Sequence, residues 1–418
     1  MRVGLFVTTE ITRIGGGVTF ERQLVSDLLK QARGSEHQFI VFSPDRYPTL
    51  ESGEPIAGTV RVEWSFFRRA LGSIANVINL LFARVLLLPY PLPYEGWLDR
   101  LLFKHRVEFF VNLTPSTITK EIPYLTCVWD LQHRLQPFFP EVSGRGRWMR
   151  SESIFTTLLR RAACVVVLGP QGKREVKEFY GISEERIKVL SLPTPQFALA
   201  AAKNNKVNLP TQYALEPGYL FYPAQFWPHK NHVSIVWALK ILRERYSYCP
   251  TVVFVGADAG NLAHVMALAE KLEVQSQVRC LGFVSRGDLV ALYQNALGLV
   301  FPSIFGPENF PPLEAFALGC PVIASAVPGA ENQLGNAALL VDPTDYTALA
   351  ETIYRLYTTP ELRSELVGRG RARALVYTGE DFARAVISFL DEFAARRRCW
   401  SGDHRYSPGF SWKKLLRG

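Results

Sequence analysis

The chain has 418 residues, of which 48% are hydrophobic, 12% aromatic and 20% charged. This composition excludes wholesale disorder, and at about 150 residues per domain the length predicts two or three domains, each with its own core. The formal net charge is +9, and the excess lies in residues 61–110 and in residues 396–418, where seven basic residues accompany one acid. Because the rest of the chain is nearly neutral, we expect no nucleic-acid partner.

Short apolar runs alternate with helical patterns along the whole chain. A helical pattern over about residues 18–32 follows the first run. Apolar strands separated by helices predict an α/β fold with parallel sheets covered on both faces. The runs are too numerous for one sheet of ordinary size, so more than one sheet is expected. They occupy residues 3–9, 38–43, 107–113, 124–130, 164–169, 187–192, 219–224, 251–257, 278–283, 298–303, 321–325 and 337–342.

Residues 192–217 separate the strands into two groups. This segment is rich in proline, asparagine and alanine and lacks strand character, which is typical of an interdomain linker. Thr378 and Asp381 predict a capping box ahead of an amphipathic helix. The expected organisation is an N-terminal domain at 1–195, a linker at 196–217, a C-terminal domain at 218–377, a further helix at 378–398 and a basic tail at 399–418.

Cysteine usage and hydropathy indicate the compartment. The six cysteines include no Cys-x-x-Cys pair, so reduced thiols in a cytoplasmic protein are expected. No signal peptide is evident at the start of the sequence. The least charged stretch, residues 70–94, is interrupted by Arg84 and is too short to span a bilayer, which needs about 20 apolar residues.

Gly15-Gly16-Gly17 follows the first strand and precedes a helix. The backbone N–H groups of Gly16 and Gly17 could therefore face an anion at the helix N-terminus. Phe20 stands where the third glycine of a dinucleotide-binding Gly-x-Gly-x-x-Gly would stand, so that motif is absent. A plain strand-to-helix turn is the alternative interpretation.

Residues 220–232, LFYPAQFWPHKNH, read as strand, loop and helix start. The loop presents Gln225, His229, Lys230 and Asn231 at the carboxyl end of a parallel strand, where open α/β sheets bind ligands. A lysine at a helix N-terminus suits phosphate, since its point charge adds to that of the helix dipole. The alternative is a surface lysine beside a proline-containing turn.

Residues 301–325, FPSIFGPENFPPLEAFALGCPVIAS, read as strand end, proline-rich loop, short helix and buried strand. Glu314 is expected in the first turn of that helix, where it could bind vicinal hydroxyls such as those of a ribose. Glu308 and Asn309 precede it, beside backbone N–H groups that could reach sugar hydroxyls or phosphate oxygens. The alternatives are helix capping for Glu314 and a solvated loop carboxylate for Glu308.

Together these motifs resemble the retaining, nucleotide-sugar-dependent glycosyltransferases of family 4. The resemblance rests on the glycine loop and on residues 222–232, 280–303 and 305–325, and it covers nearly the whole chain. It implies the GT-B fold, in which two Rossmann-like domains face each other across a cleft and a C-terminal helix crosses back to the N-terminal domain. The donor nucleotide is then expected on the C-terminal domain and the acceptor on the N-terminal domain.

The resemblance also implies roles for individual residues. Glu314 matches the second Glu of an E-x7-E motif and is expected at the ribose, whereas Gly306 stands where the first Glu belongs and Glu308 is the candidate to replace it. Lys230 is expected at the diphosphate, with Gln225 in place of a frequent arginine. The expected donor-binding residues are Gly16, Gly17, Gln225, Lys230, Gly282, Val284, Glu308, Asn309, Phe310 and Glu314.

Residues 126–141 match the strand and loop that carry a His-Asp pair in the family, with Trp129 in the His place and Asp130 in the Asp place. The expected catalytic residues are Asp130, His133 and Lys230. In such enzymes the leaving diphosphate helps to deprotonate the acceptor, so the protein positions the reactants and stabilises charge. The chain contains no Asp-x-Asp, so no metal and no cofactor beyond the donor is expected.

The leading hypothesis is transfer of a hexosyl group, mannosyl being favoured, from a nucleoside diphosphate sugar to a glycan or lipid-linked acceptor. The alternatives are a nucleotide-sugar epimerase or a phosphorylase on the same fold, and a GT-B scaffold that binds without turnover. The basic segment 396–418 and the weakly charged residues 70–94 predict peripheral attachment to an anionic membrane, on the cytoplasmic face. A solvated tail is the alternative.

Overall fold

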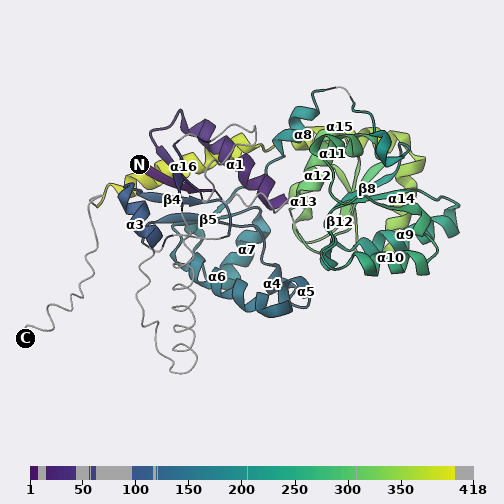
Figure 1. Ribbon diagram of the computed structural model, residues 1–418, viewed down its shortest axis with the longest axis horizontal. Coiled ribbons are helices and arrows are strands. Elements are labelled where there is room, and N and C mark those ends of the chain that lie inside the picture. The colour runs from purple at the N-terminus through teal and green to yellow at the C-terminus, as the bar shows by residue number, and fades with distance from the viewer. Residues whose placement is uncertain are drawn as a thin grey trace, which may run out of the picture.

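The computed structural model describes residues 1–7, 16–43, 56, 58–62, 97–115, 119, 121–204, 206–306 and 308–400. Gly15, residues 70–94 and residues 401–418 of the expected basic tail lie outside these ranges. The described residues form two α/β domains side by side, each built on a parallel sheet (Figure 1). The prediction of an α/β fold with two Rossmann-like domains is confirmed.

A seven-stranded sheet forms the centre of the N-terminal domain. Its strands are β1 (Arg2–Phe6), β2 (Gln38–Ser43), β3 (Val60–Arg61), β4 (Phe109–Asn112), β5 (Tyr124–Val128), β6 (Cys164–Val167) and β7 (Ile187–Val189), in the order β3-β2-β1-β4-β5-β6-β7. All neighbouring strands pair in parallel. Every residue of β4, β5 and β6 is buried, as expected for apolar strands with helices on both faces.

Helices connect these strands. They are α1 (Gly16–Ala32), α3 (Trp97–Lys104), α4 (Gln132–Leu135), α5 (Pro140–Ser143), η1 (Gly144–Gly146), α6 (Arg147–Arg161), α7 (Pro170–Tyr180) and η2 (Glu184–Arg186). The helix predicted over about 18–32 is confirmed as α1. The strand order reverses between β1 and β4, and this switch point is where open α/β sheets bind ligands.

The C-terminal domain repeats the scheme with six parallel strands. They are β8 (Leu220–Pro223), β9 (Val252–Val255), β10 (Val278–Cys280), β11 (Gly298–Phe301), β12 (Val322–Ser325) and β13 (Ala338–Val341), in the order β10-β9-β8-β11-β12-β13. The helices after the N-terminal sheet are α8 (Gln196–Ala201), η3 (Thr211–Tyr213), η4 (Pro228–Lys230), α9 (His232–Tyr246), α10 (Leu262–Lys271), η5 (Gln275–Gln277), α11 (Arg286–Asn295), α12 (Phe310–Leu318), α13 (Ala330–Leu334), α14 (Tyr346–Thr358), α15 (Pro360–Ala374) and α16 (Gly379–Arg397).

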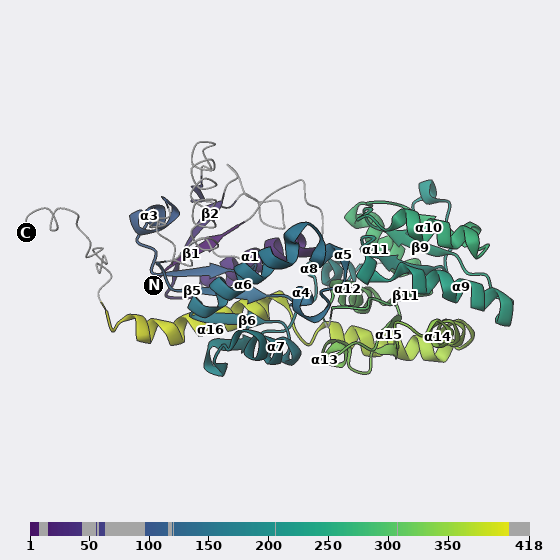
Figure 2. The same ribbon diagram turned by 90° about the horizontal axis from the view of Figure 1, so that it is seen from below.

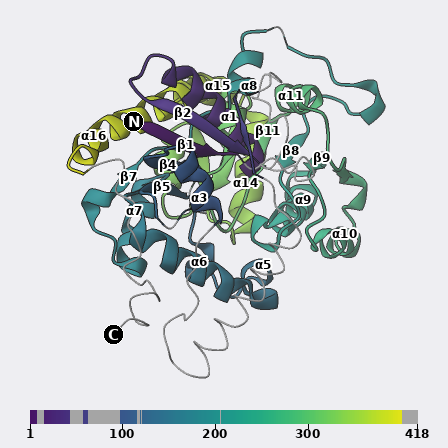
Figure 3. The ribbon, with the colours of Figure 1, turned by 60° about the vertical axis from the view of Figure 1, so that its left-hand side comes forward.

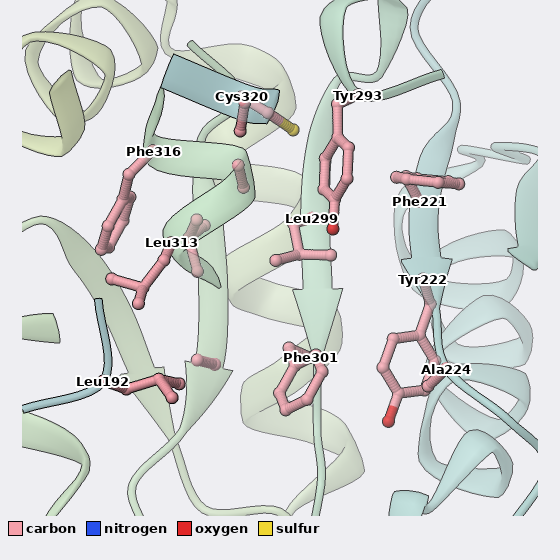
Figure 4. Packing of buried hydrophobic residues seen from close by; sticks show 14 of the residues in the cluster. Leu192, Phe221, Tyr222, Ala224, Tyr293, Leu299, Phe301, Leu313, Phe316 and Cys320 are labelled. Atoms are coloured by element: carbon pink, nitrogen blue, oxygen red, sulfur yellow. The ribbon is translucent and has the colours of Figure 1, made fainter. Parts of the chain in front are cut away.

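Aromatic side chains pack between β8 and β11 in the core of this domain. Phe301 and Tyr222 point toward each other, with ring centroids 5.3 Å apart in an edge contact (Figure 4). Phe221 makes a similar edge contact of 4.9 Å with Tyr293. The first pair holds the carboxyl ends of β8 and β11 together, and those ends carry the loops of the site, while the second pair packs β8 against α11.

The last helix, α16, returns to the N-terminal domain and lies along α1 (Figure 2). The predicted capping box is present, since Thr378 Oγ1 accepts the Asp381 N–H and the Asp381 carboxylate accepts the Thr378 N–H. Phe389 and Phe393 pack against Phe109 of β4 with tilted rings. The crossing-back helix of the GT-B expectation is therefore confirmed.

Two segments cross between the domains, and they run side by side. Thr194 and Thr378 form a parallel β-bridge, and Thr194 Oγ1 donates to the carbonyl of Ala374 at 2.7 Å. The stretch expected as a linker, residues 196–217, contains α8 and η3, and α8 packs against α12 of the C-terminal domain. In the part of the chain that the structure describes, no helix is both long and apolar enough to cross a membrane. All six cysteines are free thiols.

Candidate active site between the two domains

A cleft of about 740 Å³ separates the domains at the carboxyl ends of both sheets. It is lined from the N-terminal domain by Gln23, Trp129, Asp130, Gln132 and Leu168, from the crossing segment by Leu192, Pro195 and Phe197, and from the C-terminal domain by Pro223, Ala224, Gln225, Trp227, His229, Lys230, Val255, Gly256, Phe283, Val284, Arg286, Leu289, Phe301, Phe305, Gly306, Glu308, Asn309, Phe310, Pro311 and Glu314. Most of the residues predicted for the donor therefore meet in one cavity.

Lys230 is the central cation of the cleft. It ends η4, and its carbonyl accepts a hydrogen bond of 2.6 Å from the Tyr222 hydroxyl, which anchors the loop to the core. Its Nζ donates to Asn309 Oδ1 at 3.2 Å and lies 5.2 Å from the ring centroid of Phe301. Burial lowers the pKa of Lys230 to about 8, and the nearby carboxylate of Asp130 partly opposes this shift. A diphosphate bound here would replace the water that the ammonium has lost, through charge-assisted hydrogen bonds.

Glu314 lies on α12 and lines the cleft from the C-terminal domain. Its Oε2 accepts a 2.7 Å hydrogen bond from the buried Tyr293 hydroxyl, and burial raises the pKa of Glu314 to about 7. The positive charge of Arg286, at the start of α11, acts in the opposite direction. The helix begins at Phe310, so Glu314 is not in the first turn, and the prediction that it sits there is wrong.

The structure explains why a glycine replaces the first Glu of the E-x7-E motif. Gly306 has a φ of +109°, which strains any other residue, and a Cβ there would lie 3.0 Å from the Asn309 side-chain amide. That amide donates to the Gly306 carbonyl at 2.5 Å and also carries the oxygen that accepts from Lys230. The loop thus exchanges a carboxylate at position 306 for an ordered asparagine at position 309.

Glu308 is half-buried and bonded to the chain, so the alternative of a solvated loop carboxylate is excluded. Its Oε2 accepts the Leu192 N–H at 3.0 Å, which ties the C-terminal domain to the crossing segment. Its Oε1 lies against Gly169, the N-cap of α7, where a Cβ would collide with it. Burial raises the pKa of Glu308 to about 8. The carboxylate lines the cleft but is directed at the N-terminal side of the interface.

The other donor-side predictions have mixed outcomes. The Asn309 N–H, expected as a phosphate donor, donates instead to Gln333 Oε1 at 2.9 Å, so Asn309 contributes its side chain. Phe310 lines the cleft as the first residue of α12. Gln225 also lines it, and its Oε1 accepts from Trp227 Nε1 at 2.9 Å. These contacts hold the walls in place before any ligand binds.

Of Gly282 and Val284, both expected to bind the donor, only Val284 lines the cleft. Val284 and the half-exposed Phe283 line the cavity. Gly282 has a φ of +66°, and its carbonyl accepts the Gly256 N–H at 2.9 Å. Gly282 is not among the lining residues, so it shapes the loop and does not touch the cavity.

Gly16 and Gly17 form the first turn of α1. Figure 1 shows this end of α1, in dark purple, on the side of the N-terminal domain that faces the C-terminal domain. A helix N-terminus in that place suits an anion. Residues 8–15, which include Gly15 and precede the helix, lie outside the described residues.

Asp130 follows β5 and is exposed to the cleft, as predicted. Its Oδ1 accepts the Gln132 N–H at 3.0 Å, and its charge acts on Lys230. Trp129, beside it, lines the same cavity, and its indole N–H donates to the carbonyl of Leu113 at 3.3 Å.

His133 does not line the cleft, so its position gives no support to the prediction that it is catalytic. The side chain is 4% exposed, stacks on Phe155 with a centroid distance of 5.2 Å, and has Nε2 3.2 Å from the Tyr180 hydroxyl and 3.3 Å from Glu152. Burial lowers its pKa. The short helix α4 turns residue 133 into the domain, so its role is packing.

A histidine of the other domain does reach the cleft. His229 Nδ1 lies 2.6 Å from Glu141 Oε1, and the same oxygen accepts the His229 N–H at 3.2 Å. Burial and the neighbouring Lys230 ammonium lower the pKa of His229. The pair joins α5 of the N-terminal domain to η4. His229 belongs to the loop of residues 220–232, whose sequence suggests a ligand site, but no sequence pattern pairs it with Glu141.

Residues 210–373 match the family model described as glycosyl transferases group 1. This matched segment contains Lys230, Asn309 and Glu314 of the cleft wall, which is therefore similar to that family's domain.

Curated relatives align with about two thirds of this chain. The O-antigen chain mannosyltransferase RfbU of Salmonella typhimurium is 26% identical over 272 residues, which cover 64% of this chain and 70% of RfbU. The O-antigen chain mannosyltransferase B of Escherichia coli is 24% identical over 250 residues, which cover 60% of this chain and 66% of that protein.

Solved structures resemble the whole chain. Sucrose-phosphate synthase from Thermosynechococcus elongatus has a TM-score of 0.69 at 18% identity and covers 94% of this chain and 99% of its own. WaaG, a glycosyltransferase involved in lipopolysaccharide biosynthesis, has a TM-score of 0.64 at 16% identity and covers 93% and 99%. HepE of Anabaena in complex with UDP has a TM-score of 0.62 at 15% identity and covers 94% and 100%. Likeness at such low identity shows a shared GT-B fold.

Proposed function

We propose that the protein is a retaining, metal-independent hexosyltransferase that moves a mannosyl group from a nucleoside diphosphate sugar to a glycan or lipid-linked acceptor. The observation that carries the proposal is the interdomain cleft, in which a lysine ammonium, an ordered asparagine and a half-buried carboxylate meet at the carboxyl ends of parallel strands. The relatives named as O-antigen mannosyltransferases support this sugar and this class of product.

The donor would lie along the C-terminal wall. The diphosphate would contact Lys230 and the first turn of α1, the ribose hydroxyls would contact Glu314, and the base would lie toward Val284. Lys230, Glu314 and Val284 line the cleft. The HepE complex with UDP supports a nucleoside diphosphate on this fold. The sugar then projects toward Asp130 and Trp129, where the N-terminal domain would hold the acceptor.

In this reaction the protein mainly positions the reactants and stabilises the charge that develops. The bond from the anomeric carbon to the diphosphate breaks, and the acceptor hydroxyl oxygen bonds that carbon on the same face. The hydroxyl proton passes to the departing diphosphate oxygen. Lys230 stabilises the charge that accumulates on the diphosphate, and removal of one such contact typically costs 10²–10³ in rate. Lys230 would supply the positive charge for which other transferases use a metal, and the chain has no Asp-x-Asp.

Two features of the wall set opposite pH limits. Lys230 must be protonated to hold the diphosphate, so donor affinity is expected to fall as the pH rises through about 8. Glu314 must be ionised to accept strongly from ribose hydroxyls, so affinity is expected to fall as the pH drops through about 7. Donor binding should therefore be best in a narrow range between these values.

The acceptor and the location form part of the same proposal. A lipid-linked acceptor would be presented at the cytoplasmic face of a membrane, where the protein would be peripheral. The basic residues 396–418 stay a proposed contact with anionic lipid, and deletion of this segment should then weaken vesicle binding.

A donor screen tests the proposal. Purified protein is incubated with GDP- and UDP-sugars, with and without a lipid-linked or glycan acceptor and with a chelator in parallel samples. We expect acceptor-dependent release of one nucleoside diphosphate, unaffected by the chelator, and an anomeric configuration that NMR shows to be retained. Release without acceptor would indicate the epimerase alternative.

The binding scaffold without turnover stays a second candidate because Glu308, the nearest replacement for the missing Glu, is bonded to Leu192. Tight donor binding without release would favour it. If no nucleoside diphosphate is released and Lys230→Ala leaves donor binding unchanged, the transferase hypothesis fails.

A further inference from the structure

A glutamate of the N-terminal domain holds the residue that precedes Lys230. Glu141 lies in α5, on the side of the N-terminal domain that meets the C-terminal domain (Figures 1 and 3). Its Oε1 is 2.6 Å from His229 Nδ1 and accepts the His229 backbone N–H at 3.2 Å. Because a carboxylate only accepts, Nδ1 carries the proton of the ring. The Glu141 side chain is 6% exposed, so one buried carboxylate fixes both the backbone and the ring of His229.

The same histidine is held from its other side by the loop between β11 and α12. The Ile304 N–H donates to the His229 carbonyl at 2.8 Å, and the Ile304 carbonyl accepts from Gln136 Nε2 at 3.3 Å. Gln136 follows α4, so it also belongs to the N-terminal domain. Within this frame Lys230 Nζ meets Asn309 of the same loop at 3.2 Å. The N-terminal domain therefore bonds both loops that supply the polar groups of the C-terminal wall.

The charges around Lys230 make the contact with Glu141 more than mechanical. Among the described residues, the titratable groups that act on the ammonium or touch its loop are Asp130, Glu141 and His229. Burial lowers the pKa of Lys230 to about 8, and the carboxylates of Asp130 and Glu141 both oppose this shift. Burial also lowers the pKa of His229, so its ring is neutral near pH 7 and does not repel the ammonium.

We infer that Glu141 is a positioning residue for Lys230, so that the affinity of the C-terminal wall for a diphosphate depends on contact with the N-terminal domain. Glu141 is not among the described residues that line the cleft, so it acts through His229 and through its charge. The inference rests on the proposed function in one respect, which is that Lys230 binds the diphosphate of the donor.

This arrangement links the domain contact to the ligand. If the domains separated, the His229 N–H and ring would lose their acceptor, and Lys230 would lose a carboxylate that favours its protonated form. Because such coupling is reciprocal, a diphosphate bound at Lys230 should in turn favour the contact between Glu141 and His229.

Two substitutions separate the two actions of Glu141. Glu141→Gln keeps an oxygen that can accept from His229 but removes the charge, whereas Glu141→Ala removes both. Calorimetric titration with GDP and with UDP, between about pH 6.5 and pH 9, measures the effect. Glu141→Gln should bind nearly like the unaltered protein at the acidic end but lose affinity at a lower pH, because Lys230 then gives up its proton earlier. Glu141→Ala should bind about tenfold more weakly at every pH, since Lys230 is also no longer held in place.

Acetylation of Lys230 provides a readout that needs no nucleotide. Only the neutral amine reacts with acetic anhydride, so the pH dependence of labelling, followed by mass spectrometry, reports the pKa of Lys230. We expect a lower midpoint in Glu141→Gln than in the unaltered protein. Glu185→Gln, which removes an exposed carboxylate of the same domain, serves as the matched control and should change neither labelling nor binding. Equal thermal unfolding midpoints would show that the variants are folded.

The outcomes separate this inference from the proposed function. The inference is overturned if the labelling midpoint of Lys230 in Glu141→Gln equals that of the control, because a purely structural contact would not move it. It is also overturned if Glu141→Ala binds a nucleotide as tightly as the unaltered protein does. If neither GDP nor UDP binds the unaltered protein but the labelling midpoint shifts as expected, the positioning role stands and the proposed function fails.

Discussion

Replacement of Lys230 by methionine is expected to stabilise the free protein and to remove donor binding at the same time. Burial lowers the pKa of Lys230 from its ordinary value of 10.5 to about 8. Because one pKa unit corresponds to about 1.4 kcal/mol, keeping the buried ammonium charged costs about 3 kcal/mol. Water in the cleft screens part of this cost, leaving about 2 kcal/mol. The variant also loses the hydrogen bond to Asn309, which destabilises it by about 1 kcal/mol. The net gain is about 1 kcal/mol, a rise of about 3 °C in the unfolding midpoint.

The pH dependence of this gain has a defined sign. The pKa of Lys230 is lower in the folded protein than in the unfolded chain, so the cost is fully present below about pH 8. Between about pH 8 and the unfolded value, the unfolded chain binds the extra proton, and the stability of the unaltered protein rises. The advantage of Lys230→Met should therefore shrink as the pH approaches about 10.

Thermal unfolding and donor titration by calorimetry measure the two effects. Loss of a charged partner of a diphosphate should weaken donor binding at least about 100-fold. Lys271→Met, at an exposed lysine of α10, serves as the control and should change neither property. Unaltered donor affinity in Lys230→Met would refute the placement of the diphosphate. Loss of stability that does not vary with pH would refute the buried-charge argument.

Three further substitutions test the walls of the cleft. Glu314→Gln should weaken donor binding about tenfold at about pH 8 but little at about pH 6, because burial raises the pKa of the carboxyl and it is already protonated there. Calorimetry measures this, and a loss of affinity that does not vary with pH would contradict it. Gly169→Ala should displace the Glu308 carboxylate and expose the Leu192 amide, so hydrogen exchange at that amide should quicken by about tenfold or more, whereas unchanged protection would mean that the side chain adapts in place. Glu141→Ala should likewise quicken exchange at the backbone amide that it holds in η4, and the prediction fails if that amide exchanges as in the unaltered protein.

The fold and half of the C-terminal wall of the cleft could be predicted because they depend on local patterns. Lys230 follows an apolar strand and precedes a helix, and such a position at the carboxyl end of a parallel strand faces the ligand side of a sheet. Glu314 could be placed on its helix for the same reason, but the start of the helix was missed. Pro311 and Pro312 read as loop, yet they occupy its first turn, where proline is well tolerated.

The remaining parts of the site depend on tertiary contacts that no local pattern contains. His133 and Asp130 are close in sequence, but α4 turns one inward and leaves the other in the cleft. Glu141 and His229 are 88 residues apart and meet only because the domains face each other. Glu308 is in the expected loop, but its partner is the Leu192 N–H across the interface. In each case the direction of the side chain was decided by a distant segment.

The return of α16 to the N-terminal domain has a consequence for synthesis on the ribosome. Phe109 of β4 is covered by Phe389 and Phe393, which are made nearly 300 residues later. The C-terminal domain is continuous in sequence and can fold as soon as it leaves the tunnel, whereas the N-terminal domain must wait with an apolar face open to solvent. A chain that ends early, even by the length of one helix, would leave that face uncovered, which makes it a substrate for chaperones and proteases. The apolar face of the N-terminal domain is therefore covered only in chains that include α16.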